Sequence, residues 1–269
     1  MKGPDDSTFT GEHRPYAIGA MDDRRHMEYH QARTAENAKF WARLGGKPSF
    51  KGLTVLEVGC GHGQLCVEIA LSGARKVVGL DLNRELIDFA NHHLQTDHPQ
   101  LRDVVEFLAV ELKDYDPEKR FDAIVSYSTF EHVIDLDGLM VEIKRRLVPG
   151  GRVYFGFGPL YDSPFGDHGL TMAVVPWGHL IFPERILLAK VNNNRIAKVS
   201  SIKELGLNRW SLRQYEHLFR NSGLTVSLLK TNVCERILPR IVSSFSRIPR
   251  FGELFTFNMY GILEKPSGE

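Results

Sequence analysis

Glycines and one acidic residue, at the ends of two predicted strands, could bind a nucleoside. The glycine-rich run Glu57–Gly63 closes the apolar segment Leu53–Val58. Glycines in such a turn let backbone N–H groups approach a ligand, because no Cβ stands in the way. Asp81 directly follows the next apolar segment, Lys76–Leu80. A carboxylate there can accept hydrogen bonds from both hydroxyls of a ribose, so the pattern predicts a nucleoside site.

Three histidines are candidates for a general base. His132 follows the apolar segment that ends at Ser126, whereas His168 and His179 belong to the long segment 159–209. A neutral imidazole can take a proton from a hydroxyl or an acidic carbon near pH 7. His168 and His179 are preferred, because an otherwise apolar insertion gives no other reason for them. The structural alternative for each is a buried, hydrogen-bonded side chain or a helix cap.

Strand and helix patterns alternate through residues 49–158, which predicts βαβ units. Strands are expected at 53–58, 76–80, 104–109, 121–126 and 152–156. Helices are expected at Gln64–Leu71, after an N-cap at Asn83, and at Leu136–Leu147, where Pro149-Gly150-Gly151 turns the chain into the fifth strand. A helix from Ser211 to about Ser222 and strands at 224–229 and 254–264 follow. The predicted fold is a doubly wound α/β domain with a mostly parallel, seven-stranded sheet.

The predicted organisation has five parts. They are a flexible tail over 1–21, a helical cap over 22–48 with its helix at 22–44, a nucleoside-binding core over 49–158, a lid over 159–209, and the rest of the sheet over 210–269 with a second insertion near 232–253. Both insertions are expected over the carboxyl edge of the sheet, where such folds bind ligands.

The lid segment is too long for a passive connection in a compact domain. Its apolar residues include Tyr161, Phe165, Met172, Val174, Val175, Pro176, Trp177, Leu180, Ile181, Phe182 and Leu187. Such a surface suits a flat or apolar small molecule. Alternatively, Leu180–Leu188 is a helix docked on the core by its apolar face.

Three motifs in order resemble those of the class I S-adenosylmethionine-dependent methyltransferases. Glu57–Gly63 resembles their first motif, Phe121–Val133 their fourth, and Leu147–Val153 the one after it. A dinucleotide fingerprint needs a third glycine at the sixth position, which is Gln64 counted from Gly59. The spacing therefore disfavours a dinucleotide oxidoreductase. The resemblance implies a Rossmann-like fold, S-adenosylmethionine as cofactor, and transfer of its methyl group to a small acceptor.

The resemblance also implies which residues hold the methionine part of the cofactor. The backbone of Gly59, Cys60 and Gly61 would face it, and Glu57 would help to hold its ammonium end. The side chains of Cys60 and Cys66 are expected to pack in the core. The alternative for Glu57 is that its carboxyl only satisfies backbone groups.

For the rest of the cofactor, Asp81 would bind the ribose and Leu82 would pack on the adenine. Glu111 and Leu112 stand where the family binds adenine, although Val110-Glu111 replaces the usual Gly-Asp. Ser126 and Tyr127 would lie beside the methyl group. The alternative for Ser126 is again a contact with the backbone alone.

No metal is predicted. Glu131-His132-Val133 resembles a motif of quinone-biosynthesis methyltransferases, some of which carry an acidic residue three positions earlier and bind a divalent ion. Ser128 occupies that position here. Asp167, His168 and His179 are too few to indicate a metal site by themselves.

Composition limits the other functions. The net charge is +1, the three cysteines form no CxxC pair, and no run of 18 apolar residues occurs. We therefore expect no membrane span, no disulfide framework and a cytoplasmic location.

The favoured activity is O-methylation of an aromatic or apolar small molecule in secondary or cofactor metabolism, with carbon or nitrogen as other acceptors. Alternatives are an RNA or protein methyltransferase, for which Arg236, Arg240, Arg247 and Arg250 give a local basic segment, and a non-catalytic module that binds the cofactor. The strand ending in Ser126-Tyr-Ser-Thr lacks the Asn/Asp-Pro-Pro-Tyr typical of base methylation, which argues against nucleic acid. A homodimer is left open.

Overall fold

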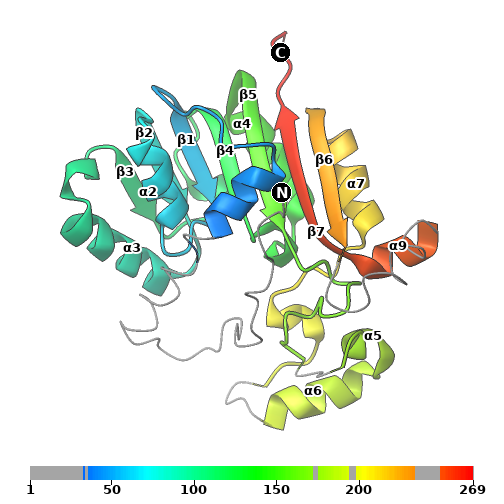
Figure 1. Ribbon diagram of the computed structural model, residues 1–269. Coiled ribbons are helices and arrows are strands. Elements are labelled where there is room, and N and C mark those ends of the chain that lie inside the picture. Colours follow the sequence, from blue (N-terminus) through cyan, green and yellow to red (C-terminus); the bar gives the residue numbers. More distant parts are fainter. Residues whose placement is uncertain (1–32, 34–35, 172–174, 194–197, 234–248, 269) are drawn as a thin grey trace, which may run out of the picture.

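The computed structural model describes residues 33, 36–171, 175–193, 198–233 and 249–268. Its centre is a seven-stranded sheet in the order β3-β2-β1-β4-β5-β7-β6 (Figure 1). The strands are β1 (Thr54–Val58), β2 (Lys76–Leu80), β3 (Val105–Leu108), β4 (Phe121–Tyr127), β5 (Leu147–Phe157), β6 (Thr225–Val233) and β7 (Thr256–Glu264). The first five are parallel, and β7 runs antiparallel to both β5 and β6. The predicted doubly wound, mostly parallel fold is confirmed.

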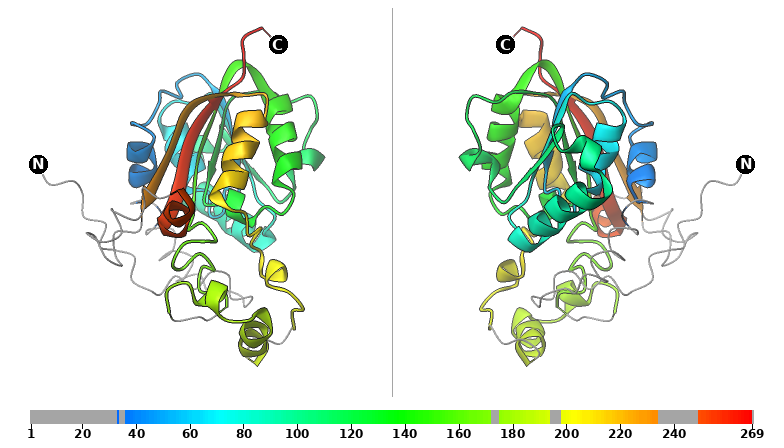
Figure 2. Two further views of the ribbon diagram at one scale, coloured as in Figure 1. Left: turned by 90° about the vertical axis from the view of Figure 1, so that its right-hand side faces the viewer. Right: turned by 90° about the vertical axis from the view of Figure 1, so that its left-hand side faces the viewer.

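Helices cover both faces of the sheet (Figure 2). The N-terminal helix at 36–43, α2 (Gln64–Leu71) and α3 (Arg84–Asp97) share one apolar core, which contains Phe40 and Ile69. On the other face, α4 (Leu136–Arg146) and α7 (Leu212–Asn221) share a second core. Of the helix predicted at 22–44, residues 33 and 36–43 are helical. Residues 22–32, 34 and 35 lie outside the described part of the chain.

Local capping explains where two helices begin. The side chain of Asn83 accepts hydrogen bonds from the backbone N–H groups of Glu85 and Leu86, as its position predicted. Ser211 and Gln214 form a capping box at the start of α7. The sequence therefore sets these starts without help from the rest of the fold.

Several strand boundaries differ from those expected, and β6, for example, continues four residues further, to Val233. The strand β5 begins at Leu147, so Pro149-Gly150-Gly151 lies inside it, and the pairing with β4 shifts register between Phe121 and Ala123. Lys265 pairs with Gly150 and Gly151 through backbone hydrogen bonds, which local turn propensity does not reveal. The strand β7 begins at Thr256, because α9 (Pro249–Phe255) occupies the residues before it.

The lid lies beyond the carboxyl ends of the parallel strands, as predicted, and away from both faces of the sheet (Figures 1 and 2). It contains α5 (Gly178–Ile181), α6 (Glu184–Asn193) and the short 3-10 helix η4 (Ile202–Leu205). The alternative of a single helix at Leu180–Leu188 is wrong, because Pro183 cannot continue α5 and instead opens α6. No helix among the described residues is long and apolar enough to cross a membrane.

Candidate cofactor and acceptor site

The turn after β1 is built on glycines with positive φ. Gly59, Gly61 and Gly63 have φ of 76°, 51° and 82°. A Cβ on Gly59 would lie 2.1 Å from Oγ1 of Thr129, whereas one on Gly61 would meet nothing within 4 Å. The turn therefore needs glycine at position 59 for two reasons, its backbone conformation and the close approach of the loop after β4. This turn leads into α2 and fits the cradle expected for the methionine part of a cofactor.

Asp81 ties the end of β2 to this turn. Its Oδ2 accepts a hydrogen bond from the N–H of Gly61 at 2.9 Å, and its Oδ1 accepts one from the N–H of Asn83 at 2.8 Å. Burial raises the pKa of this carboxyl, although the backbone hydrogen bonds oppose the rise. An ionised carboxylate has about four acceptor sites, so the fixed group can still bind the two hydroxyls of a ribose. Beside it the Leu82 side chain is 69% exposed, as a surface for adenine would be.

Glu57 is buried at the end of β1. The thiol of Cys66 donates a hydrogen bond to its Oε2 at 3.0 Å. Burial is the main cause that raises the pKa of Glu57 to about 8. Cys66 is therefore more than a packing residue, while Cys60 is buried in the core as expected.

The two residues expected near adenine lie differently from each other. Glu111 is exposed and forms an ion pair with Lys113 at 2.6 Å. Leu112 is buried in the core on the α4 side, at the start of the 3-10 helix η2 (Leu112–Asp114). Its side chain is therefore part of the apolar core, and its backbone is what could face a ligand there.

The end of β4 combines a structural serine with an aromatic stack. The hydroxyl of Ser126 donates to the carbonyl of Val58 at 3.0 Å and is buried, so its contact is the backbone one. The ring of Tyr127 stacks on Phe40 with centroids 4.7 Å apart. The guanidinium of Arg33 lies 4.5 Å from the centre of the same ring.

Three polar side chains meet beside β4. Glu131 and His132 come from the 3-10 helix η3 (Phe130–His132), and His168 comes from the lid. Each offers a ligand atom within 4.8 Å of the other two, and the two imidazoles make an edge contact with centroids 5.2 Å apart. The structure thus brings together two of the three predicted histidines.

Backbone groups orient all three side chains. His132 Nδ1 lies 2.7 Å from the carbonyl of Gly206, and His168 Nε2 lies 2.9 Å from that of Pro159. Each contact assigns the N–H to that nitrogen and leaves the lone pair on the other one. Glu131 Oε1 accepts from the N–H of Gly158, while its buried Oε2 has no hydrogen-bond partner among the described residues. Burial lowers the pKa of His168 to about 4 and raises that of Glu131.

His179 lies elsewhere in the lid. Its Nε2 is 2.6 Å from the carbonyl of Tyr161, and its Nδ1 is 3.8 Å from Oδ1 of Asp167. Asp167 also accepts hydrogen bonds from the backbone and hydroxyl of Thr171. Since all of these groups are buried, the contacts match the structural alternative for His179.

Among the residues that the structure describes, Glu131, His132 and His168 also form a group that could hold a metal ion. Imidazoles with a carboxylate suit zinc and similar ions better than magnesium, which prefers oxygen ligands. Carbonyls that fix the second nitrogen of each imidazole are typical of metal sites. The expectation of no metal was based on Ser128 and on the small number of ligands among Asp167, His168 and His179. It did not combine His168 with Glu131 and His132.

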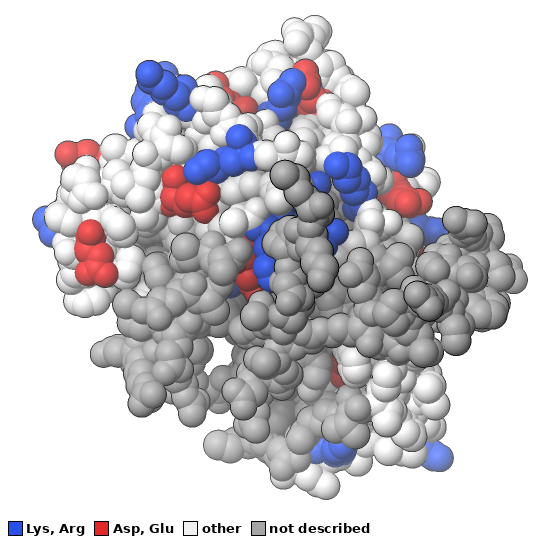
Figure 3. Space-filling model, in the orientation of Figure 1, with Lys and Arg blue, Asp and Glu red and all other residues white. Residues whose placement is uncertain are grey.

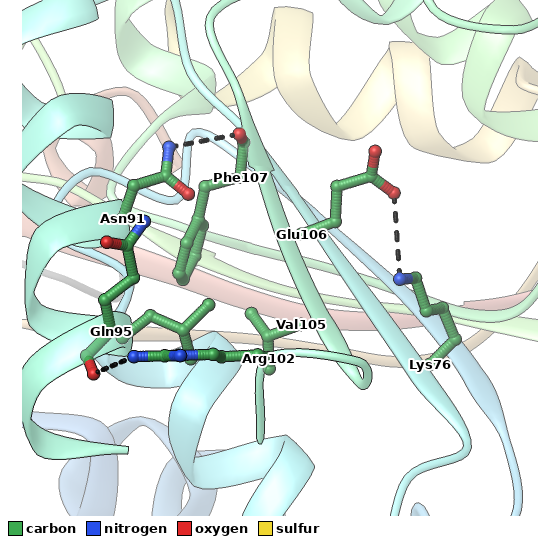
Figure 4. Close-up of a pocket in the computed structure, with 8 residues that line it drawn as sticks. Lys76, Asn91, Gln95, Arg102, Val105, Glu106 and Phe107 are labelled. Atoms are coloured by element: carbon green, nitrogen blue, oxygen red, sulfur yellow. Dashed lines mark hydrogen bonds and ion pairs between the residues drawn. The ribbon is translucent and has the colours of Figure 1, made fainter. Parts of the chain in front are cut away.

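A cavity of about 500 Å³ opens at the β3 edge of the sheet (Figure 4), and its lining does not include Glu131, His132 or His168. It lies between α3 and β3, and four of its polar side chains are engaged with other groups of the protein. Asn91 donates to the carbonyl of Phe107, Arg102 donates to that of Gln95, and Lys76 pairs with Glu106. We find no group in it aimed at a ligand.

On the face in Figure 3, the described Lys and Arg side chains are interspersed with Asp and Glu and form no continuous basic patch. Arg236, Arg240 and Arg247 lie outside the described residues, and the side chain of Arg250 is also not described.

Sequence comparison identifies the family. Residues 28–229 match the family described as methyltransferase domain. The chain belongs to that family. The predicted class, class I S-adenosylmethionine-dependent methyltransferase, is therefore confirmed, together with its cofactor.

Curated relatives match this methyltransferase in part. It is 35% identical to the mitochondrial ubiquinone biosynthesis O-methyltransferase of Candida albicans over 133 residues. This aligned segment covers 47% of this chain and 40% of that protein. It is 33% identical over 118 residues to the ubiquinone biosynthesis O-methyltransferase of Mesorhizobium japonicum, 42% of this chain and 45% of that protein. The chain thus spans less than half the length of these relatives.

Solved structures share the fold of this methyltransferase. A putative S-adenosylmethionine-dependent methyltransferase from Listeria monocytogenes gives a TM-score of 0.55 at 18% identity, covering 85% of this chain and 99% of that one. The geranyl diphosphate C-methyltransferase of Streptomyces coelicolor gives a TM-score of 0.56 at 16% identity, covering 93% of this chain and 85% of that one.

Sequence reasoning missed three residues of the methyltransferase site. They are Arg33 at the aromatic stack, Thr129 against Gly59, and Asn208, whose amide donates to the carbonyls of Phe130 and Val133. No short motif marks Arg33 or Asn208, because each acts on a distant part of the chain. Thr129 lies within the motif Phe121–Val133, but its contact with Gly59 could not be read from that motif.

Proposed function

We propose that this methyltransferase transfers the methyl group of S-adenosylmethionine to a hydroxyl oxygen of a small aromatic or apolar molecule. The observation that carries this proposal is the cluster of Glu131, His132 and His168, which lies immediately after the end of β4. Relatives named as O-methyltransferases support oxygen over carbon or nitrogen. A role in secondary or cofactor metabolism, in the cytoplasm, is part of the same proposal.

The proposed cofactor contacts follow from the geometry of the two turns. Gly59 to Gly61 would face the methionine part, Glu57 its ammonium, Asp81 the ribose, and Leu82 the adenine. When bound, the sulfonium supplies both the methyl group and its leaving group. The protein has mainly to align the acceptor, and alignment can contribute about 7–11 kcal/mol to lowering a barrier. Glu111, Leu112, Ser126 and Tyr127 would complete the wall of the site.

We assign the general base to His132, assisted by His168. The lone pair of His132 is on Nε2, since its Nδ1 faces the carbonyl of Gly206. His168 stays neutral at pH 7, because burial lowers its pKa to about 4, and so it can orient the acceptor hydroxyl without adding charge. His179 is assigned a role in holding the lid, because its Nε2 contacts the carbonyl of Tyr161 and its buried Nδ1 lies 3.8 Å from Asp167 without a hydrogen bond.

The lid supports an apolar acceptor. Phe165, Leu180 and Phe182 keep 39%, 39% and 44% of their surface exposed. Such surface in a segment next to the polar cluster fits a ring or chain whose hydroxyl reaches His132.

Histidine variants test this assignment. His132→Ala should lower kcat about 10²- to 10⁴-fold toward the best substrate in a panel of phenols and acids. His168→Ala should also lower kcat, and both should keep their affinity for S-adenosylhomocysteine. His179→Ala is the matched control, for which we expect a lower Tm at nearly normal kcat. Full turnover in both His132→Ala and His168→Ala would contradict the assignment, and silence of the wild type across the panel would favour a non-catalytic binding module.

Chelation separates a base from a metal site. We expect dialysis against EDTA to leave kcat unchanged, as the absence of an acidic residue at Ser128 predicts. A loss of kcat that zinc or magnesium restores would instead assign Glu131, His132 and His168 to an ion. Such an ion, when bound, would lower the pKa of the acceptor hydroxyl.

A further inference from the structure

Cys66 contacts the acid at the end of β1 from the first turn of α2. Its thiol donates the 3.0 Å hydrogen bond to Oε2 of Glu57 across nine residues of chain. The side chain of Cys66 is fully buried, and Glu57 is only 3% exposed. In such surroundings a hydrogen bond to a carboxyl group is stronger than it would be in water. The thiol therefore fixes one oxygen of Glu57 at the entry to the glycine turn.

A glycine in β2 makes the room for this thiol. Gly79 is the partner of Glu57 in the register of β1 and β2. A Cβ on Gly79 would lie 2.9 Å from the sulfur atoms of both Cys60 and Cys66. The two sulfurs therefore fill the space that a larger residue at position 79 would take, next to the acid.

Both thiols keep their protons at neutral pH. Burial is the main cause that raises the pKa of Cys60, and it raises the pKa of Cys66 well above its usual value. The charge of Glu57 adds to both rises. An ionised carboxylate is only an acceptor, so a neutral thiol beside it must donate. The contact therefore favours the ionised form of Glu57.

Two charged groups also act on Glu57. The charge of Arg33, from the N-terminal helix, favours ionisation, whereas that of Asp81, at the end of β2, opposes it. Burial opposes ionisation more strongly than any of these groups, and the thiol of Cys66 has the largest effect in its favour. The charge state of Glu57 at neutral pH therefore depends on Cys66 more than on either charged neighbour.

We propose that Cys66 is a positioning residue, whose thiol holds Glu57 by a hydrogen bond and thereby sets the pH range in which the protein binds S-adenosylmethionine. The proposal rests on the cofactor site of the proposed function, in which Glu57 holds the ammonium of the methionine part. It adds to that site a fully buried residue that acts through Glu57. An ammonium binds an ionised carboxylate more tightly than a neutral one, so a donor that favours ionisation extends binding to lower pH.

Cys66→Ala removes the thiol and keeps the backbone, so it tests the hydrogen bond. The pH at which half of Glu57 is ionised should rise by about one unit in this variant. By calorimetry, the variant should bind S-adenosylhomocysteine about tenfold more weakly than the wild type at pH 7, and only about twofold more weakly at pH 9. The ratio of the two affinities at each pH removes the titration of the ligand's own amino group.

Two further variants and a second ligand serve as controls. Cys66→Ser keeps a donor at the same position, so its affinity should stay within threefold of that of the wild type at both pH values. Val67→Ala is the matched control, because Val67 is the next residue on α2 and is also buried in the core. It should lower the Tm and leave the affinity unchanged. 5′-Methylthioadenosine has the nucleoside thioether but no amino acid, so it should bind Cys66→Ala within twofold of the wild type.

A loss in Cys66→Ala that is equal at pH 7 and pH 9, or equal for both ligands, would show a purely structural role and overturn the proposal. Unchanged affinity in Cys66→Ala would overturn it as well. A loss in Cys66→Ser as large as that in Cys66→Ala would do the same, because the donor would then not be the cause.

The wild type separates this proposal from the proposed function. If its affinity for S-adenosylhomocysteine does not depend on pH but it methylates a substrate in the panel, the role of Cys66 fails and the proposed function stands. If it binds with the expected dependence on pH but methylates nothing, the proposed function fails, and Cys66→Ala still decides the role of the thiol. Wild-type protein that binds neither ligand overturns both.

Discussion

The cofactor half and the acceptor half of the site are built in different ways. Gly59, Gly61 and Asp81 lie within one βαβ unit, and their contacts run through the backbone. The acceptor half joins η3 to the lid, through the contact of His132 with the carbonyl of Gly206. The first half therefore depends on local chain geometry, and the second on how a distant insertion docks. We expect changes in the first half to act on cofactor affinity and changes in the lid to spare it.

The largest loss of cofactor affinity is expected from Asp81→Ala. The change removes the proposed acceptor of both ribose hydroxyls and the hydrogen bond to the N–H of Gly61. We expect about a 100-fold weaker Kd for S-adenosylhomocysteine, or about 2.8 kcal/mol, by calorimetry. Asp122→Ala is the control, because Asp122 also accepts a backbone hydrogen bond, from Thr54, at the start of β4. Equal losses of affinity in both variants would mean that any carboxylate hydrogen-bonded to the sheet affects cofactor binding as much as Asp81 does.

Gly59→Ala should follow, at about a 30-fold weaker Kd, or about 2 kcal/mol. The new Cβ would stand 2.1 Å from Oγ1 of Thr129 and force the two loops apart. Gly61→Ala shares the positive φ but meets nothing within 4 Å, so its loss should be under fivefold. The difference between the two, measured by the same titration, isolates the contact between loops. Without such a difference, the cradle would not depend on Thr129.

Glu57 should give a smaller effect that depends on pH. Its folded pKa of about 8 lies above the usual value of 4.5. Between pH 4.5 and about 8, the carboxyl of Glu57 is therefore protonated in the folded protein and ionised in the unfolded chain. Binding of an ammonium favours the ionised form, so affinity for S-adenosylhomocysteine should rise about 25-fold from pH 6 to 7.5, as the ionised fraction does. Calorimetry across this range measures the slope.

Glu57 should make the stability of the fold fall with rising pH, whereas the affinity for the cofactor product rises. Because the folded pKa is raised, the free energy of unfolding should fall as pH rises from about 4.5 to 8. Glu57→Gln should flatten both the affinity and the stability profiles, and denaturant unfolding at several pH values checks the second. A Glu57→Gln protein that keeps both slopes would assign them to another group.

The same contrast explains what the sequence could predict. The glycine turn, Asp81 and the N-cap at Asn83 are local patterns whose geometry follows from a few neighbouring residues. The joining of His168 to His132 depends on a lid that crosses more than 30 residues of chain, and nothing near either histidine indicates it. His179 shows the same limit, since residue type and an apolar neighbourhood suited a base, but burial against Asp167 and Tyr161 was invisible.

The lid should show the smallest effect on the cofactor. Leu187 is buried in a separate cluster with Tyr161, Ile202 and Leu207, so Leu187→Ala should weaken lid packing by about 2–5 kcal/mol. Hydrogen exchange of lid amides should then speed up, and kcat/KM for the acceptor should fall as His168 loses its place. The Kd for S-adenosylhomocysteine should change less than twofold. Ile186→Ala, on the same helix but 51% exposed, should alter none of these. A loss of cofactor affinity in Leu187→Ala as large as that in Asp81→Ala would mean that the two halves fold as one unit, and that the lid helps to build the cradle as well as the acceptor site.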